Sequence, residues 1–414
     1  MKSISLAAWM LLLCAAAHAQ PGAYSNINGY AVPAGPASDP AGIAAGPDGA
    51  LWFTEYYGNN IGRITTSGAF TEYPLPTTNS QAAGITAGPD GALWFTECEN
   101  NKIGRITTAG SLTEYPVPTA DSCPEGIAAG PDGALWFTEF YGNHIGRITT
   151  LGAFTEYPIP HGVANANSIA AGPDGALWFT EYSAGRIGRI TTAGMITEYP
   201  FDGGGGVPWA ITTGPDGALW FTDRRTPPLI GRITTAGQIT EYPVPNQFCC
   251  NYGITTGPDG ALWFTEPSSL ARITTSGVIT EFPLPIADSF GDGITAGPDG
   301  ALWFTESSTG MIGRAPACAL GFSASFANST LTMNFNLGID TPATLRIHLR
   351  NAGGPLATPF SRDLPAVVPP QAFSITVNNF PNLGEVVVEP SLATQPGGAG
   401  LGLCAEWATV NTAQ

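Results

Sequence analysis

The chain has 414 residues, of which only 11% are charged, and its formal net charge is −17. This acidic balance argues against a nucleic-acid-binding surface, because little basic surface is available to replace the counterions of a phosphate backbone. It also argues against docking on an anionic membrane. Glycine (53) and proline (37) are frequent, which predicts many turns and few helices. The hydrophobic share of 43% is enough to form a sizeable core.

The first 19 residues have the layout of a secretory signal peptide. Lys2 precedes an apolar run from Ile4 to Ala17, and Ala17-His18-Ala19 forms a small-residue cleavage motif before Gln20. The run is too short to span a bilayer. We therefore expect cleavage near Ala19 and a mature protein that is secreted or periplasmic, with no later membrane span.

Seven repeats fill the following 300 residues or so. The string GPDGALWFT, followed by Glu or Asp, recurs every 40 to 43 residues. Each unit contains four short segments rich in Ile, Thr, Trp, Phe and Tyr, which glycine turns separate. Four strands per unit and seven units predict an all-β fold, a seven-bladed β-propeller over residues 20–315. The string begins at Gly46, Gly88, Gly130, Gly172, Gly214, Gly257 and Gly297.

The two ends of the repeat region predict how the ring closes. The seventh unit stops after Ile312-Gly313-Arg314 and lacks the final I-T-E-Y-P strand of the other units. The mature N-terminus carries an imperfect copy of that strand, INGYAVP, at residues 27–33. We therefore expect this N-terminal strand to complete the last blade, so that no sheet edge stays open.

Residues 316–414 leave the repeat and predict a small C-terminal β-sandwich-like domain of normal domain size. Its expected strands are Leu331–Leu337, Ala343–Leu349, Phe373–Val377 and Glu385–Val388. Packing or adhesion is the role that we expect of it, because no chemical motif is legible there.

Six cysteines follow the signal peptide, and an even number in an oxidising compartment predicts disulfides. Cys98 and Cys123 fall on the same face of adjacent units, so we expect them to pair. Cys318 and Cys404 bracket the C-terminal domain and are expected to pair as well. The adjacent Cys249 and Cys250 form a vicinal disulfide or pair elsewhere.

Variable segments of the repeats point to a binding face. Two turns of each unit are nearly identical in all units, whereas the other loop and the links between units vary, and variable loops on a rigid scaffold carry binding sites. The residue before each Gly/Ala/Ser-Ile pair begins the innermost strand and should ring the channel mouth. These residues are Ala41, Ala83, Glu125, Asn167, Trp209, Tyr252 and Asp292.

The ring predicts a lopsided cleft, with small residues on one side and carboxyls, an amide and two aromatic rings on the other. Asn167, Trp209 and Tyr252 are the candidate ligand-binding residues, for a small-molecule or peptide ligand on the variable-loop face. The alternative interpretation is a merely polar rim.

Each unit also carries one acid at the end of its second strand and one arginine on the neighbouring strand. Catalytic groups are rarely repeated in every unit, so we expect these to form matched acid–arginine pairs in the scaffold. The aspartates of the PDG motif are expected to be turn residues. The acids are Glu55, Glu97, Glu139, Glu181, Asp223, Glu266 and Glu306, and the arginines are Arg63, Arg105, Arg147, Arg189, Arg232, Arg272 and Arg314.

The repeated units G-I-T-A-G-P-D-G-A-L-W-F-T-E, I-G-R-I-T-T-A-G and I-T-E-Y-P-V-P resemble the streptogramin (virginiamycin B) lyase family from about Ile27 to Arg314. The resemblance implies that a cyclic depsipeptide antibiotic is opened by elimination, with a base that removes an α-proton and a Mg²⁺ ion that stabilises the enolate-like charge. In that family a histidine precedes the sixth inner strand and Glu-Pro-His precedes the seventh. A further Glu lies four residues after the Trp of the seventh blade's second strand.

This chain departs from the family pattern at those positions. Tyr252 stands at the first histidine position, residues 290–292 (Phe-Gly-Asp) stand for Glu-Pro-His, and Ser307 stands for the last Glu, one residue after Glu306. Asp292 and Glu306 remain as candidate ligands of Mg²⁺, since hard cations take carboxylates. Glu125 occupies the histidine slot of another blade, so Glu125 and Asp292 are the candidate catalytic groups, Glu125 acting as a base if its pKa is raised. The mature chain retains only His144, His161 and His348.

Three functional interpretations follow, and whether the protein is an enzyme stays open. The first is an exported, monomeric propeller that binds a ligand or protein without the family's histidine-based elimination. The second is a metal-dependent carbon–oxygen lyase with a rearranged carboxylate site. The third is a structural or adhesive cell-surface protein that attaches through its C-terminal domain.

Overall fold

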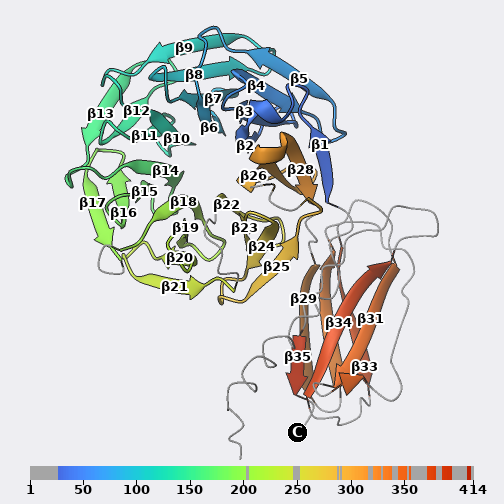
Figure 1. Ribbon diagram of the computed structural model, residues 1–414. Coiled ribbons are helices and arrows are strands. Elements are labelled where there is room, and N and C mark those ends of the chain that lie inside the picture. Colours follow the sequence, from blue (N-terminus) through green and yellow to red (C-terminus); the bar gives the residue numbers. More distant parts are fainter. Residues whose placement is uncertain are drawn as a thin grey trace, which may run out of the picture.

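The computed structural model describes residues 27–201, 205–245, 252–286, 289 and 291–315, together with the backbone of seven strands after residue 319. The predicted signal peptide lies outside the described residues. Seven four-stranded antiparallel sheets stand radially around a central channel, so the predicted all-β, seven-bladed propeller is confirmed (Figure 1). In the part of the chain that is described, no helix is both long and apolar enough to cross a membrane.

Six blades follow the chain in sequence order, from the channel outward. Their strands are β2 (Pro40–Ala45), β3 (Leu51–Glu55), β4 (Asn60–Ile64) and β5 (Phe70–Pro74); β6 (Ala82–Ala87), β7 (Ala92–Glu97), β8 (Lys102–Thr107) and β9 (Leu112–Pro116); β10 (Pro124–Ala129), β11 (Leu135–Glu139), β12 (His144–Ile148) and β13 (Phe154–Pro158); β14 (Ala166–Ala171), β15 (Ala176–Glu181), β16 (Arg186–Thr191) and β17 (Ile196–Pro200); β18 (Pro208–Thr213), β19 (Leu219–Asp223), β20 (Leu229–Ile233) and β21 (Ile239–Pro243); and β22 (Ile254–Thr256), β23 (Leu262–Thr265), β24 (Ser269–Ile273) and β25 (Ile279–Pro283).

The seventh blade closes the ring with the N-terminal strand, as expected. Its order is β1 (Asn28–Ala31), β28 (Met311–Ala315), β27 (Leu302–Glu306) and β26 (Gly291–Ala296). Tyr30 of β1 stacks on Trp303 of β27, with ring centroids 5.7 Å apart. The outer-strand Tyr73 stacks on Trp52 of its own blade in the same manner. The N-terminal strand therefore supplies the packing that a fourth strand supplies elsewhere.

The C-terminal region forms two further antiparallel sheets, in agreement with the β-sandwich-like prediction. One has the order β29 (Leu320–Ala327), β30 (Thr330–Leu337), β33 (Gln371–Asn378), and the other has the order β32 (Gly354–Pro355), β31 (Thr344–Asn351), β34 (Glu385–Ala393), β35 (Ala408–Asn411). Cys318 and Cys404 lie outside the described residues, so their pairing stays a prediction.

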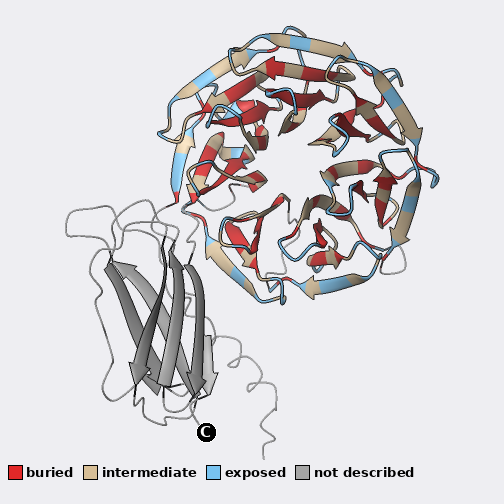
Figure 2. Cartoon of the chain, turned by 180° about the vertical axis from the view of Figure 1, so that it is seen from behind, coloured by how far each residue is buried: buried red, intermediate tan, exposed pale blue. Residues whose placement is uncertain are grey.

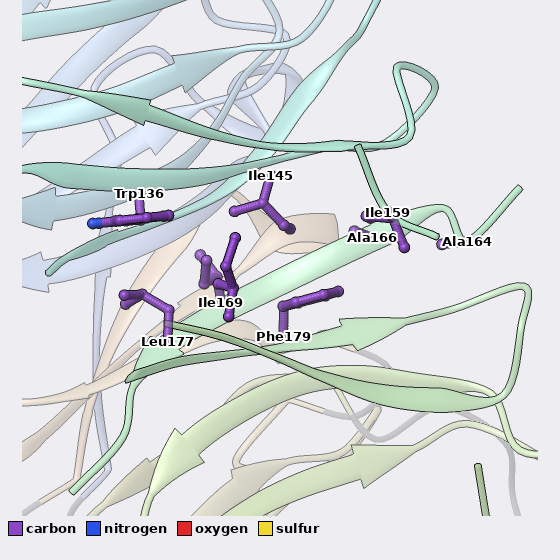
Figure 3. Packing of buried hydrophobic residues seen from close by; sticks show 9 residues of the cluster. Trp136, Ile145, Ile159, Ala164, Ala166, Ile169, Leu177 and Phe179 are labelled. Carbon is purple, nitrogen blue, oxygen red and sulfur yellow. The ribbon is translucent and has the colours of Figure 1, made fainter. Parts of the chain in front are cut away.

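The core lies between neighbouring blades. The second strands are buried along their whole length, whereas the outermost strands alternate between half-buried and exposed residues (Figure 2). Each blade covers its neighbour on both faces, which explains the unbroken apolar runs of the LWF segments. Trp136 of the third blade packs toward Ile169 and Leu177 of the fourth (Figure 3). At each of the seven interfaces between blades, one tryptophan indole packs against isoleucine and leucine side chains of the next blade.

The expected pairing of arginines with the strand-ending acids is wrong. Arg63 Nε instead lies 2.7 Å from Oδ2 of Asp48, the aspartate of the PDG turn. Oδ1 of Asp48 accepts a 3.0 Å hydrogen bond from the Trp52 indole. The register explains the partner: Trp52 is opposite Arg63 and Glu55 is opposite Asn60, so Glu55 lies at the far end of the hairpin. The other arginines repeat this bond with Asp90, Asp132, Asp174, Asp216, Asp259 and Asp299.

All of the strand-ending acids are instead buried, and five of them (Glu55, Glu97, Glu139, Glu181 and Glu266) have a carboxyl oxygen without a hydrogen-bond partner among the described residues. Neither carboxyl oxygen of Glu181 has a hydrogen-bond partner among the described residues, and its side chain is fully buried. Burial, with the nearby charge of Glu198, raises the pKa of Glu181 to about 8. Burial also raises the pKa of Glu97 to about 7 and, with the charge of Glu156, that of Glu139 to about 8. These carboxyls are therefore protonated in the folded protein at mildly acidic pH.

These raised pKa values predict that the protein is more stable in mild acid than at alkaline pH. The unfolded chain releases these protons above a pKa of 4.5, whereas the folded chain holds that of Glu181 up to about pH 8. The stabilising contribution is complete below the unfolded pKa and is lost as pH rises through the folded one. The melting temperature, followed by circular dichroism, should therefore fall between about pH 5 and pH 9.

The variant Glu181→Gln should flatten this dependence by up to about 1.4 kcal/mol of unfolding free energy per pH unit in that window. Glu99→Gln, at an exposed position in the β7–β8 loop, is the matched control and should follow the parent curve. A melting temperature that stays constant or rises with pH would contradict the assignment.

Candidate functional site

Threonines of the WFT segments hold the inner strands in a closed ring. The Thr96 hydroxyl accepts a 2.9 Å hydrogen bond from the Gly84 amide of its own blade and donates a 2.7 Å bond to the carbonyl of Glu125 in the next. Each acceptor carbonyl belongs to a residue of the ring predicted at the channel mouth. We call this ring of hydrogen bonds the threonine belt. Its other six hydroxyl-to-carbonyl bonds run from Thr54 to Ala83, Thr138 to Asn167, Thr180 to Trp209, Thr222 to Tyr252, Thr265 to Asp292 and Thr305 to Ala41.

A cavity of about 440 Å³ opens within this ring. Six of the seven residues predicted to ring the channel mouth line it, namely Ala41, Ala83, Glu125, Asn167, Trp209 and Asp292, whereas Tyr252 does not. The inner strands approach closely here, since a Cβ atom on Gly84 would lie 2.5 Å from the Glu125 carbonyl. The volume is within the usual range of small-molecule sites.

Carboxyl groups occupy one part of the cavity wall. Burial, together with the charge of Asp292, raises the pKa of Glu125 to about 7. Burial and the charge of Asp39 raise the pKa of Asp292 to about 6, although the Arg224 charge opposes the shift. Asp39 also lines the cavity, and burial raises its pKa. The charges of these three carboxyls therefore act on one another across this space, and Glu125 and Asp292 are partly protonated near neutral pH.

Next to Trp209, which lines the cavity, a guanidinium group lies between two aromatic rings. Cζ of Arg224 lies 4.3 Å from the ring centroid of Trp209 and 4.5 Å from that of Tyr252. Trp209 also makes an edge contact with Tyr182, and its carbonyl accepts a 3.2 Å hydrogen bond from the Asn167 amide. The two aromatic rings predicted on one side of the cleft, Trp209 and Tyr252, thus have the Arg224 guanidinium between them, which cation–π attraction holds there.

Sequence reasoning missed Asp39, Tyr56 and Arg224. Tyr56 lines the cavity, donates a 3.0 Å hydrogen bond to the Gln81 side chain and has its pKa raised to about 12 by burial and the Glu125 charge. Both Tyr56 and Arg224 directly follow a strand-ending acid. That position differs among the units (Tyr56, Cys98, Phe140, Tyr182, Arg224, Pro267, Ser307), so comparing the units there would have found them.

The two candidate magnesium ligands have different surroundings. Asp292 lines the cavity, but Glu306 does not. Glu306 is buried to 3% exposure, and a hydrogen bond from Thr309 opposes the rise that burial causes in its pKa. Its position matches that of the buried acids of the other blades. The pair therefore does not fit a shared magnesium site facing the cavity, and a metal role for either residue stays a prediction.

The predicted cysteine pair in adjacent blades is joined. Cys98 follows β7 and Cys123 precedes β10, and a disulfide connects them. Cys249, Cys250 and Phe290 lie outside the described residues. His144 begins β12 with Nδ1 3.9 Å from Glu139, and His161 lies in the next inter-blade link. Neither histidine lines the cavity.

Fold and site together define a seven-bladed β-propeller with a cavity of small-molecule size at one mouth of its channel. The model of the virginiamycin B lyase family matches residues 19–212 and 205–319. The chain belongs to this family, and the resemblance seen in its repeats is confirmed.

Solved structures agree with this assignment. A virginiamycin B lyase from Staphylococcus aureus shares 40% identity and a TM-score of 0.67, over 70% of this chain and 98% of that one. A streptogramin B lyase structure shares 38% identity and a TM-score of 0.67, over 71% and 98%. A catalytically inactive S. aureus virginiamycin B lyase with quinupristin shares 39% identity and a TM-score of 0.66, over 70% and 98%.

Curated relatives match over a short segment. Virginiamycin B lyases of Bordetella parapertussis and Bordetella bronchiseptica are 55% and 52% identical over 40 residues. These matches cover 10% of this chain and 13% of each relative.

The threonine belt predicts a position-specific cost for losing one hydroxyl. Thr96→Val keeps the side-chain shape but leaves the Gly84 amide and the Glu125 carbonyl without their partner. Leaving such buried groups unpaired should lower the unfolding free energy by about 1–3 kcal/mol in urea denaturation. Thr71→Val, exposed on β5, is the control and should stay within about 0.5 kcal/mol of the parent. Equal effects of the two substitutions would contradict a structural role for the belt.

Proposed function

We propose that this protein is an exported, monomeric propeller that binds a small-molecule or peptide ligand in the channel-mouth cavity, without the histidine-based elimination of its family. The cavity itself carries the proposal. Asp39, Glu125, Asp292 and Trp209 line it. Arg224 is held between the rings of Trp209 and Tyr252, and its charge acts on Asp292. Such a wall offers carboxyl groups and aromatic surface to one ligand, with a fixed cation behind the Trp209 ring.

The histidine positions support the non-catalytic interpretation. A general base works best with a pKa near the operating pH, which is why a histidine suits α-proton removal. Tyr252 and Asp292 stand at the positions where the resemblance places the two histidines of the family. Function follows the residues of a site more closely than its fold, so family membership alone does not carry the lyase activity to this chain.

Metal-assisted elimination is the second candidate, and the carboxyl pKa values favour it. Glu125, with a pKa of about 7, is partly ionised at neutral pH and can accept a proton. Asp292, with a pKa of about 6, lies in the same cavity. A bound Mg²⁺ ion would supply Lewis-acid stabilisation of an enolate-like charge. Asp292 is the one of the two candidate ligands that faces the cavity.

The adhesive alternative rests on the C-terminal domain. Of that domain, the structure describes the backbone of seven strands. Association of the purified protein with cells or polymers, without saturable ligand binding at the cavity, would select this alternative.

Quinupristin, present in the structure of the inactive relative, is the probe that separates binding from catalysis. We expect saturable binding by isothermal titration calorimetry and no ring-opened product by mass spectrometry, with Mg²⁺ or with a chelator. Trp209→Ala should weaken binding about tenfold or more, because it removes one wall of the cavity. Tyr141→Ala, a 69% exposed aromatic residue that does not line the cavity, should leave binding unchanged.

A ring-opened product without gain of water, lost on chelation and in Asp292→Ala, would establish elimination and overturn the non-catalytic proposal. Absence of both product and binding would remove cyclic depsipeptides from the candidate ligands.

A further inference from the structure

Three metal-ligating side chains meet at the edge of the cavity. Among the described residues, Cys98, Cys123 and Glu125 form a group whose sulfur and carboxylate atoms all lie within 4.8 Å of one another. The Cys123 sulfur is 3.5 Å from Oε1 of Glu125. The two sulfurs are bonded to each other as a disulfide. Neither the fold of the family nor the expected magnesium ligands account for this group.

Backbone contacts hold each of the three residues separately. The Cys98 amide donates a 3.3 Å hydrogen bond to the Gln81 carbonyl, and the Cys123 carbonyl accepts a 3.1 Å bond from the Phe140 amide. The Glu125 carbonyl accepts the 2.7 Å bond from Thr96. Loss of the sulfur–sulfur bond would therefore leave the three donors close together.

We propose that Cys98, Cys123 and Glu125 form a redox-controlled site for a thiophilic divalent cation such as Zn²⁺, which binds when the disulfide is reduced. Two thiolates and one carboxylate are a ligand set that favours zinc over magnesium. Three protein ligands leave a fourth position free, which is the pattern of zinc sites that also take water or a ligand. Glu125 lines the cavity, so that position is expected to adjoin it.

One of the observed spacings already fits tetrahedral coordination. Zinc bonds of about 2.3 Å to sulfur and about 2.0 Å to oxygen place those two atoms about 3.5 Å apart in a tetrahedron, which equals the separation of Cys123 Sγ and Glu125 Oε1. The two sulfurs must move to about 3.8 Å from each other, a change that side-chain rotation can supply.

The redox step balances with an external reductant. A dithiol supplies two electrons and two protons and is itself oxidised to a disulfide, so that the protein disulfide becomes two thiols. A phosphine supplies the two electrons and becomes a phosphine oxide, with its oxygen and the two protons coming from water. Zinc binding then displaces the two thiol protons, since the thiolate is the metal ligand. In the oxidised protein the two sulfurs are bonded to each other and the Glu125 carboxyl faces the cavity without a metal. In the reduced protein that carboxyl would be a ligand of the metal ion. The redox state would thus decide which chemistry the cavity wall presents.

The test uses the full protein, reduced with a phosphine, desalted without oxygen and exposed to Zn²⁺ or Cd²⁺ alone. We expect one metal ion per chain attributable to this site by elemental analysis, and a thiolate-to-metal charge-transfer band with Cd²⁺. Zinc should protect the Cys98 and Cys123 peptides from alkylation, as read by mass spectrometry. The oxidised protein should lack the charge-transfer band and this protection.

Substitutions test whether Cys98 and Glu125 bind the metal ion. Cys98→Ser should abolish the charge-transfer band of this site, and Glu125→Gln should weaken zinc binding about tenfold or more. The double substitution Cys249→Ser and Cys250→Ser keeps the three ligands and should retain both signals. Near-ultraviolet circular dichroism checks that each reduced variant is folded.

The alkylation measurement needs no variant, so the proposal stays testable even if a substitution impairs folding. Equal alkylation of Cys98 and Cys123 with and without zinc in the folded, reduced parent protein would overturn it. So would zinc uptake that Cys98→Ser leaves unchanged. Quinupristin binding by the oxidised protein tests the ligand-binding proposal separately, so the two can fail independently.

Discussion

Hydrogen bonds from one threonine hydroxyl per blade hold the inner strands of this propeller in a closed circle. Each hydroxyl accepts a hydrogen bond from a backbone amide of its own blade and donates one to a backbone carbonyl in the next blade. The last of these bonds, from Thr305 to Ala41, joins the seventh blade to the first. The bonded groups are backbone atoms, so the side chain at each ring position is free to vary. The belt thereby fixes the backbone position of each ring residue but leaves its residue type open.

The repeated charges serve the scaffold, and the chemistry lies in what is not repeated. An aspartate of every PDG turn bonds both the indole and the arginine of its blade, as Asp48 does with Trp52 and Arg63. The buried strand-ending acids occupy the opposite end of the hairpin. Glu125, Asp292 and Arg224 have no such counterpart in every blade. The cavity differs from one side to the other because Glu125 and Asp292 line it at positions where the other units have different residues.

Electrostatics at the mouth follow from burial more than from net charge. Asp39, Glu125 and Asp292 share a confined space, and desolvation raises the pKa of each. Arg224 opposes this at Asp292 while it is stacked between two aromatic rings. The wall can therefore change its charge near neutral pH. Family membership accounts for the scaffold, whereas these particular side chains decide which ligand, metal or reaction the cavity supports.

The repeat period, the four strands of each unit, the N-terminal closing strand and the ring positions could all be derived from the sequence. They depend on local patterns, such as apolar runs, glycine turns and the missing final strand of the seventh unit, and these patterns are legible residue by residue. The Cys98–Cys123 pair followed from the same spacing argument. Comparing the units at one further position would also have exposed Tyr56 and Arg224.

Only the tertiary structure showed which side chains contact one another. The arginines bond the turn aspartates because antiparallel register places Trp52, not Glu55, opposite Arg63. Arg224 fills the space between Trp209 and Tyr252 because adjacent blades converge at the channel mouth. Glu306 lies away from the cavity that Asp292 lines, although both belong to the seventh blade. Sequence periodicity determines the strand and the face of a residue, but the closure of seven sheets into a ring determines which side chains meet.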